Sequence, residues 1–161
     1  MRLQINKRVF SLGDKYDITD DQGNPVYQVQ GHLFTLGKKL DLLDMAGNEV
    51  AKIHQSVFSL VSEYDIIQGG QVMAVVKQKL FSLFHLQFTV EGPGVVYEME
   101  GDWLNWNYDI RTNGQTIAQI GQQFTVFQDR YGMEIVEGAD IPLLVCLAIV
   151  IDEVAHPKAQ W

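Results

Sequence analysis

The chain has 161 residues, of which 47% are apolar and 20% charged, a composition typical of a single globular domain with a sizeable core. Its formal net charge of −8 at pH 7 argues against general nucleic-acid binding, because contacts with phosphates need a basic surface. The opening text MRLQINKRVFSLGDKYD lacks the apolar stretch of a secretory signal, so we expect residues 1–161 to form one cytoplasmic domain.

A repeat runs along most of the chain. Triplets that usually combine an aromatic or aliphatic residue, an acid and an aliphatic residue begin at Tyr16, Leu40, Tyr64, Phe88, Tyr108 and, more loosely, Tyr131. The first four triplets begin 24 residues apart, and each follows a short apolar run: VFSL, LFTL, VFSL or LFSL. A turn containing Gly, Asn or Asp comes after each triplet, and a second alternating run follows most turns.

The alternation within these units predicts β-strands with one buried and one exposed face. Tyr16 and Ile18 share a face, whereas Asp17 points the other way, and later copies repeat the pattern. With the opening run RLQINKRVFSL, the units predict twelve strands between about residues 2 and 137. A two-stranded unit is too small for a propeller blade, so a closed antiparallel barrel fits better, because closure removes exposed edges.

An apolar stretch, Ile141 to Ile151, lies near the end of the chain. It could be a membrane anchor, a thirteenth strand or a buried helix. As a helix it would rise about 16 Å, well short of a hydrocarbon core of about 30 Å, which argues against an anchor. Its leucines favour helix over strand. Asp140 can cap the start, Pro142 falls in the first turn and Pro157 lies beyond the end, so we predict a helix over residues 141–155.

The predicted helix needs an enclosing structure, and the predicted barrel has a lumen that a helix can fill. A helix that is apolar on all sides must be buried on all sides. Twelve strands tilted by about 40° leave a lumen roughly 10–12 Å wide, the diameter of one helix with its side chains. The predicted fold is therefore an all-β, twelve-stranded closed antiparallel barrel around a buried C-terminal helix. Cys146, the only cysteine, lies in that helix, so no disulfide can form within the chain, which is typical of a reducing compartment.

The text VFSLGDKYDITDDQGNPVYQVQG resembles the opening of LURP-one-related proteins, and the similarity extends over essentially the whole chain. That family resembles the phospholipid scramblases and has the tubby C-terminal-like fold, a barrel with a central hydrophobic helix. The resemblance implies a non-enzymatic module. Tubby proteins bind phosphoinositide head groups through basic residues, so the resemblance also implies an anionic lipid head group as a candidate ligand.

Three lysines and two tryptophans are the candidate site residues. Lys15, Lys38 and Lys39 lie on one rim of the predicted barrel, where they could hold a phosphate-bearing head group. Alternatively, they neutralise Asp152 and Glu153 and the negative end of the helix, which should lie near the same rim. The tryptophans could line a ligand site or an interface, or pack within a strand of a shortened repeat. They are Trp103 and Trp106.

No residue pattern predicts catalysis or metal binding. The histidines lack partners at metal-ligand spacing, and the serines of the apolar runs recur in several copies, which favours a structural role. The four histidines are His32, His54, His85 and His156. Asp20, Asp21 and Asp44 lack the spacing of a calcium loop and fit turn chemistry instead.

These observations predict a non-catalytic cytoplasmic binding or scaffold module with an unidentified protein partner. The alternative is peripheral membrane binding to phospholipid or phosphoinositide head groups. A weaker alternative is a small-molecule carrier or enzyme that uses the tryptophan patch. We expect no nucleic-acid partner, no transmembrane segment, no metal and no cofactor.

Overall fold

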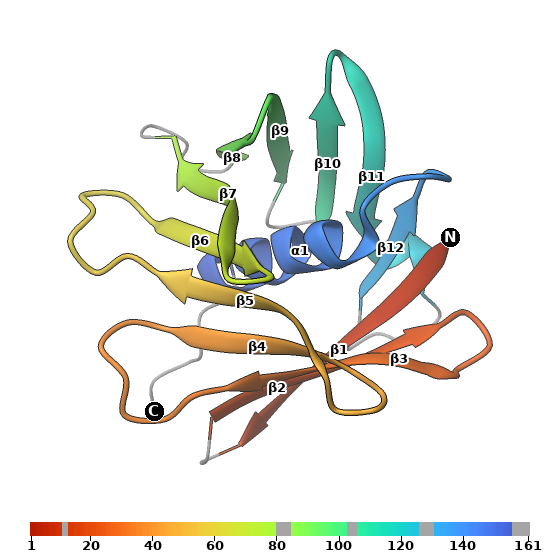
Figure 1. Cartoon of the computed structure of the whole chain (residues 1–161). Coiled ribbons are helices and arrows are strands. Elements are labelled where there is room, and N and C mark those ends of the chain that lie inside the picture. The colour runs from red at the N-terminus through yellow and green to blue at the C-terminus, as the bar shows by residue number, and fades with distance from the viewer. Residues whose placement is uncertain (11–12, 80–84, 103–105, 126–130, 156–161) are drawn as a thin grey trace.

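Twelve antiparallel strands form a closed barrel in this computed structural model, which describes residues 1–10, 13–79, 85–102, 106–125 and 131–155. Each strand pairs with its neighbours in sequence, and β1 closes the barrel against β12 (Figure 1). The strands are β1 (Arg2–Phe10), β2 (Gly13–Asp20), β3 (Pro25–Gly31), β4 (Lys39–Asp44), β5 (Glu49–Gln55), β6 (Glu63–Gln68), β7 (Gln71–Gln78), β8 (His85–Gly92), β9 (Val95–Asp102), β10 (Asn107–Thr112), β11 (Gln115–Gly121) and β12 (Tyr131–Ile135). A short 3-10 helix, η1 (Gln122–Phe124), precedes β12, and α1 (Ile141–Ala155) follows it. The predicted fold class is confirmed.

The meander gives the barrel two different ends. The connections β2–β3, β4–β5, β6–β7, β8–β9 and β10–β11 lie at one end, together with the start of α1, and we call it the turn end. The connections β1–β2, β3–β4 and β5–β6 lie at the opposite end with the last turn of α1, and we call it the loop end. The helix therefore runs from the turn end to the loop end.

The repeated triplets build the core as the alternation predicts. The first and third residue of the five regular triplets point inward and are buried, whereas the middle residue, an Asp in four of them and Thr89 in the other, faces outward. The buried pairs are Tyr16 and Ile18, Leu40 and Leu42, Tyr64 and Ile66, Phe88 and Val90, and Tyr108 and Ile110. The alternating strands add inward residues such as Ile5, Ile53 and Val76, and all of them belong to one continuous core.

Helix α1 fills the middle of this core. Every residue from Leu143 to Glu153 is buried, and Figure 1 shows the helix running through the barrel. Asp140 caps the start as predicted, because its Oδ1 accepts a hydrogen bond of 3.2 Å from the amide of Leu143. Pro157 lies outside the described residues. Within the described part of the chain, no helix has both the length and the apolar character needed to cross a membrane.

Two turn-end connections show why the aspartates occur there. Asp20 Oδ1 accepts hydrogen bonds from the amides of Gln22 and Asn24, at 2.9 and 2.8 Å. In the turn that follows β4, Asp44 Oδ1 likewise accepts hydrogen bonds from the amides of Ala46 and Asn48, at 2.9 and 2.8 Å. The side-chain amides of Asn24 and Asn48 donate to the other oxygen of Asp20 and Asp44, at 2.9 and 3.1 Å. These side-chain bonds, followed by the backbone bonds, hold the pKa of both carboxyls below the ordinary value, because they favour the ionised form. The prediction of turn chemistry for these aspartates is therefore confirmed.

Candidate functional site

Two carboxylates are buried side by side in the last turn of α1, at the loop end. The side chains of Asp152 and Glu153 are 3% and 0% exposed. The C-terminal end of a helix carries partial negative charge, so two acids there are unfavourable unless other groups compensate. Both acids are enclosed by residues of the strands and loops at this end.

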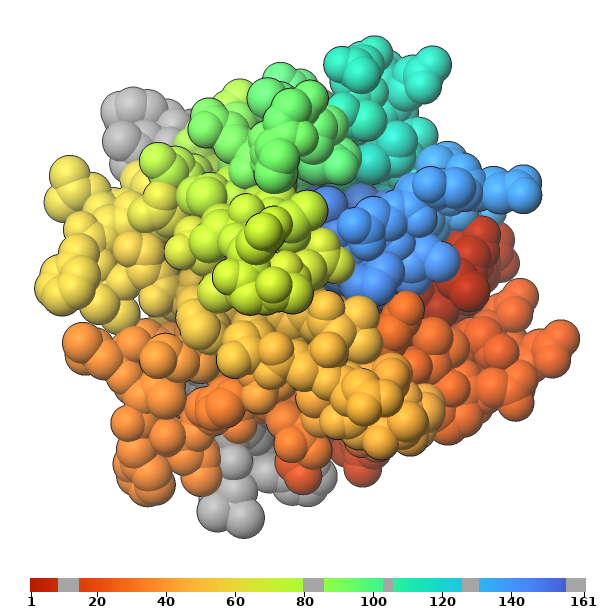
Figure 2. Space-filling view, in the orientation of Figure 1, coloured from red at the N-terminus to blue at the C-terminus, as the bar shows by residue number. Residues whose placement is uncertain are grey.

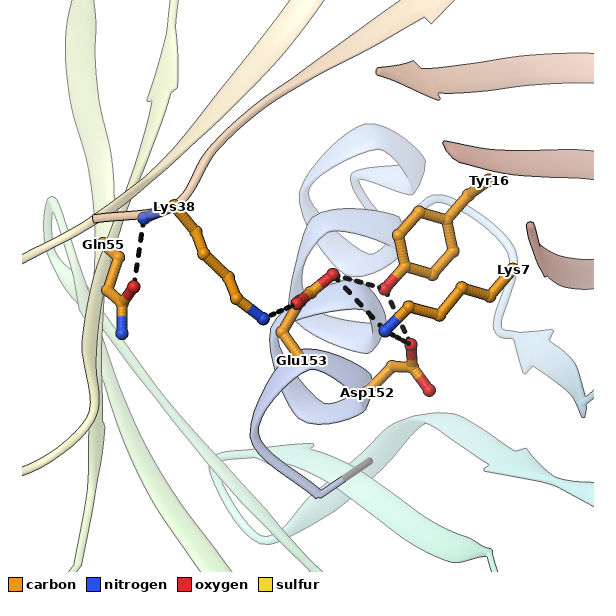
Figure 3. Close-up of polar contacts among 6 residues, drawn as sticks. All are labelled: Lys7, Tyr16, Lys38, Gln55, Asp152 and Glu153. Atoms are coloured by element: carbon orange, nitrogen blue, oxygen red, sulfur yellow. Dashed lines mark hydrogen bonds and ion pairs between the residues drawn. The ribbon is translucent and has the colours of Figure 1, made fainter. Parts of the chain in front are cut away.

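Tyr16 and Lys7 reach the two acids from neighbouring strands (Figure 3). The Tyr16 hydroxyl lies 2.7 Å from Asp152 Oδ2 and 2.7 Å from Glu153 Oε1, so its one hydrogen is shared between two carboxylate oxygens. Lys7 Nζ lies 3.2 Å from Asp152 Oδ2 and 3.6 Å from Glu153 Oε1. Lys7 is directly opposite Tyr16 in the β1–β2 register, and its ammonium lies 5.5 Å from the centre of the tyrosine ring.

Lys38 supplies the second cation, and it comes from the loop between β3 and β4. Its ammonium pairs with Glu153 Oε2, and its backbone amide donates to Gln55 Oε1 at 3.0 Å (Figure 3). The amide of Gln55 in turn donates to the Lys38 carbonyl at 2.8 Å. Lys38 therefore ties the β3–β4 loop both to the end of the helix and to strand β5.

The resulting cluster has two cations and two anions, so its formal charges balance. Burial, followed by the charges of Asp152 and Glu153, raises the pKa of Tyr16 well above its ordinary value, and the phenol stays protonated as a donor. Each group of the cluster already has a partner within it. This arrangement holds strand, loop and helix together, and we call these five residues the anchor cluster: Lys7, Tyr16, Lys38, Asp152 and Glu153.

Two loops beside the anchor cluster expose large apolar side chains. They are residues 32–38, between β3 and β4, and residues 56–62, between β5 and β6, and we call them the apolar loops. Phe34 is 104% exposed, Leu60 102% and Phe58 92%. Leu36 is also exposed, at 76%. Elsewhere in the described chain, the exposed large apolar residues lie between 48% and 57%, so the apolar loops are distinct. Figure 2 shows both loops projecting from the body of the barrel.

The apolar loops have a defined conformation. The amide of His32 donates to the Lys39 carbonyl at 2.8 Å and closes the first loop, and Ser56 makes the equivalent bond to Glu63 at 2.9 Å in the second. Phe34 has a φ of +57°, a left-handed conformation that is costly for a bulky residue. Gly37, with a φ of +78°, touches the second loop so closely that an added Cβ would lie 2.6 Å from Val57 Cγ1. The two loops thus pack against each other.

The structure separates the three predicted lysines. Lys38 turns toward the helix, so the alternative that a rim lysine neutralises the helix acids is confirmed for this residue. Lys15 is exposed on β2, opposite Gln30 of β3, and Gln30 is opposite Asp41 of β4. Lys39 is exposed at the start of β4, opposite His54. A head-group role for Lys15 and Lys39 stays a prediction.

The other predicted groups are dispersed. Trp106 lies in a turn just before β10 rather than within a strand, but it is partly buried, and its ring centre lies 4.9 Å from that of Tyr131, so it packs against the core. Trp103 and His156 lie outside the described residues. His32 forms an exposed contact of 2.7 Å with Asp41. Among the described residues, no group of His, Cys, Asp or Glu could hold a metal ion.

A large surface depression, about 480 Å³ in volume, lies near the turn end rather than beside these groups. It runs between the β2–β3 turn and η1 and includes Arg2, Gln4 and Phe124. Gln4 Nε2 donates to the Phe124 carbonyl at 2.7 Å, and the Arg2 guanidinium lies 5.5 Å from the Phe124 ring. The Gln4 amide nitrogen and the Arg2 guanidinium thus already serve local contacts, and neither the three lysines nor the two tryptophans of the predicted site line it.

Reasoning from sequence missed the apolar loops. The runs LFTL and VFSL precede the strands, and in the sequence they served only as markers of the repeat. The signal was present, because both runs stand outside the strict alternation of the triplets and are flanked by Gly or Ser. The pairing of Lys38 with Glu153 links residues 115 positions apart, and only the closed barrel brings them together.

The geometry defines an antiparallel barrel filled by its own C-terminal helix. The model of the LURP-one-related family matches residues 1–152, and the chain therefore belongs to that family. The fold is similar to the X-ray structure of a protein from Arabidopsis thaliana, with a TM-score of 0.69 and 18% sequence identity. That match covers 95% of this chain and 91% of the other. A comparison with curated protein sequences finds no match.

Proposed function

We propose that this protein is a non-catalytic intracellular binding module whose ligand-binding surface is the loop end of the barrel. The observation that carries this proposal is the concentration of fully exposed Phe and Leu side chains on the apolar loops. Such exposure is unfavourable in water, and patches of this kind mark sites of interaction with proteins or membranes. Family membership also supports a non-enzymatic role.

The filled lumen favours an external site. Small-molecule carriers of the barrel class hold ligands inside, but α1 occupies that space here and its residues from Leu143 to Glu153 are buried. The anchor cluster contains two acids, two amines and a phenol, yet these groups are paired with one another. Turnover of a substrate that disappears on a point substitution within the described residues would contradict the non-catalytic proposal.

Site-specific photo-crosslinking tests where the ligand binds. A benzophenone amino acid replaces Leu60 at the loop end or Met45 at the turn end, both exposed, in cells that produce the protein. We expect covalent adducts, to protein or to lipid, from position 60 and few from position 45. Equal adducts from both positions, or none from either, would contradict a binding surface at the loop end.

A second candidate function is recognition of an anionic lipid head group by the loop-end lysines. It is favoured by the exposure of Lys15 and Lys39 near this end. The Lys15→Glu/Lys39→Glu variant should lose binding to phosphoinositide-containing vesicles, most strongly at low salt. Unchanged vesicle binding by this variant would count against head-group recognition.

The alternative of a small-molecule carrier or enzyme that uses the tryptophan patch has a different test. It requires that a ligand quench the tryptophan fluorescence.

A further inference from the structure

The two ends of the barrel differ in charge as well as in apolar exposure. The turn-end connections, residues 20–24, 44–48, 68–71, 91–94, 112–115 and 136–140, are all described and contain no lysine or arginine. Their acidic residues are Asp20, Asp21, Asp44, Glu91, Glu137 and Asp140. The apolar loops and their first flanking residues, 31–39 and 55–63, contain two cations, Lys38 and Lys39, and one acid, Glu63, which pairs with Lys77 at 3.3 Å. The turn-end connections are therefore more negative than the apolar loops.

We infer that the apolar loops insert into the interface of a lipid bilayer with an anionic surface. This inference rests on the proposed function and names its partner. A bilayer provides an apolar interior directly behind a negatively charged surface. Exposed Phe and Leu side chains at the loop tips match the first feature, and the exposed Lys39, which directly follows the first loop, matches the second. The acidic turn end is repelled by the same surface, so the charge distribution orients the barrel with its loop end toward the membrane.

The rigidity of the loops supports insertion. Phe34 is held in its left-handed conformation without packing its side chain on the protein, so the backbone displays the ring rather than buries it. Lys38 connects the first loop to Glu153 of the buried helix, and Gly37 packs the first loop on the second. The loops therefore keep their shape before contact with the bilayer, which lowers the entropic cost of binding.

Vesicle co-sedimentation with matched variants tests the inference. The probes are vesicles of phosphatidylcholine alone and of phosphatidylcholine with about 30% phosphatidylserine, at low and physiological salt. The Phe34→Ser/Phe58→Ser variant removes two loop-tip rings, and the Val72→Ser/Val96→Ser variant removes two exposed apolar side chains from the barrel wall. All four side chains are exposed, so both variants should fold, and circular dichroism checks this.

We expect the wild type to bind the anionic vesicles. The phenylalanine variant should bind at least about tenfold more weakly, because each ring loses its transfer from water into the interface. The valine variant should bind within about twofold of the wild type. Failure of the wild type to bind either vesicle, or an equal loss in both variants, overturns the inference.

A single fluorescent label reports the orientation. Cys146 is fully buried, and burial raises the pKa of its thiol, so a cysteine introduced at the surface can be labelled selectively. A nitrobenzoxadiazole label at Ser59→Cys, between two exposed apolar residues, should become brighter and blue-shifted with anionic vesicles. The same label at Ala46→Cys, in a turn at the opposite end, should not change. Equal changes at both positions would contradict the proposed orientation.

The failure of this inference is distinguishable from failure of the proposed function. Protein adducts from position 60 without vesicle binding would overturn membrane insertion and leave a protein-binding module. Concentration-dependent dimers that disappear in the Phe34→Ser/Phe58→Ser variant, again without vesicle binding, would overturn it in favour of a second copy of the chain. If the protein gave no adducts from position 60, no vesicle binding and no dimers, the proposal of a binding surface at the loop end would itself be contradicted.

Discussion

The hydroxyl of Tyr16 should stabilise the fold strongly, whereas the hydroxyl of Tyr108 should not. The two tyrosines begin identical triplets, Tyr-Asp-Ile, and both are buried. The Tyr16 hydroxyl lies 2.7 Å from each of two buried carboxylates. The Tyr108 hydroxyl is buried without a hydrogen-bond partner among the described residues. Tyr16→Phe therefore removes a hydroxyl that is hydrogen-bonded to two carboxylates, whereas Tyr108→Phe removes a hydroxyl that is buried without a partner among the described residues.

The magnitude follows from the charge on the partners. A hydrogen bond to a charged group contributes about 1.5–3 kcal/mol, and its loss here also leaves a buried carboxylate with fewer donors. We expect Tyr16→Phe to lower the free energy of unfolding by about 2–3 kcal/mol. For a chain of this size, that corresponds to a fall in Tm of roughly 4–12 °C. Tyr108→Phe should change the free energy by less than about 0.5 kcal/mol, because an unpaired buried hydroxyl contributes no net stabilisation.

Urea denaturation at pH 7, followed by tryptophan fluorescence, gives both free energies under one condition. Differential scanning calorimetry then checks the expected difference in Tm. A Tyr16→Phe variant as stable as Tyr108→Phe would refute the reasoning, because it would mean that the Tyr16 hydroxyl donates no effective bond to the helix acids.

Four further expectations follow from the same contacts. Lys7→Met should cost about 3–5 kcal/mol by leaving a buried acid without its cation, and adding Asp152→Leu should recover part of that loss in a double-mutant cycle monitored by urea denaturation. Gly37→Ala should destabilise more than Gly47→Ala in thermal unfolding, since both have positive φ but only Gly37 has a neighbour where the methyl would go. Asp44→Asn should be less stable than the wild type near neutral pH, and the difference should disappear as the pH falls below 3.8, because the lowered folded-state pKa stabilises only the ionised form. Above pH 10, stability should fall and most of the rise in tyrosine absorbance should accompany unfolding, because burial raises the pKa of four of the six tyrosines, those in the core, and the unfolded chain alone loses those protons.

The barrel could be predicted from sequence because its evidence is local and repeated. Each triplet alternates, each turn supplies Gly, Asn or Asp, and the helix has a capping residue at Asp140. The size of the lumen then required a helix to fill it. By contrast, the partners of Lys7, Lys38 and Glu153 depend on how three distant segments meet, and residue types alone do not specify that pairing.

The candidate site was harder to predict because its apolar residues belong to the same repeat as the residues of the core. In the runs LFTL and VFSL, Phe34 and Phe58 have the same residue type as core aromatics such as Phe88, yet their exposures are opposite. The difference is positional: Phe88 lies within a hydrogen-bonded strand, whereas Phe34 and Phe58 lie in the connections between strands. Hydrophobicity alone therefore identifies the apolar residues but does not say which of them face water.

A barrel built from hairpin repeats necessarily gathers equivalent connections at the same end. Every second connection returns to one rim, so a chemical feature that recurs with the repeat becomes a property of a surface. Acidic turns after β2 and β4 make one end negative, and apolar runs before β4 and β6 make the other end apolar. The anchor cluster then fixes the apolar end to the central helix through Lys38 and Glu153. The repeat that builds the core thus also produces a polarised molecule, and that polarity, rather than any single residue, is what an anionic bilayer would recognise.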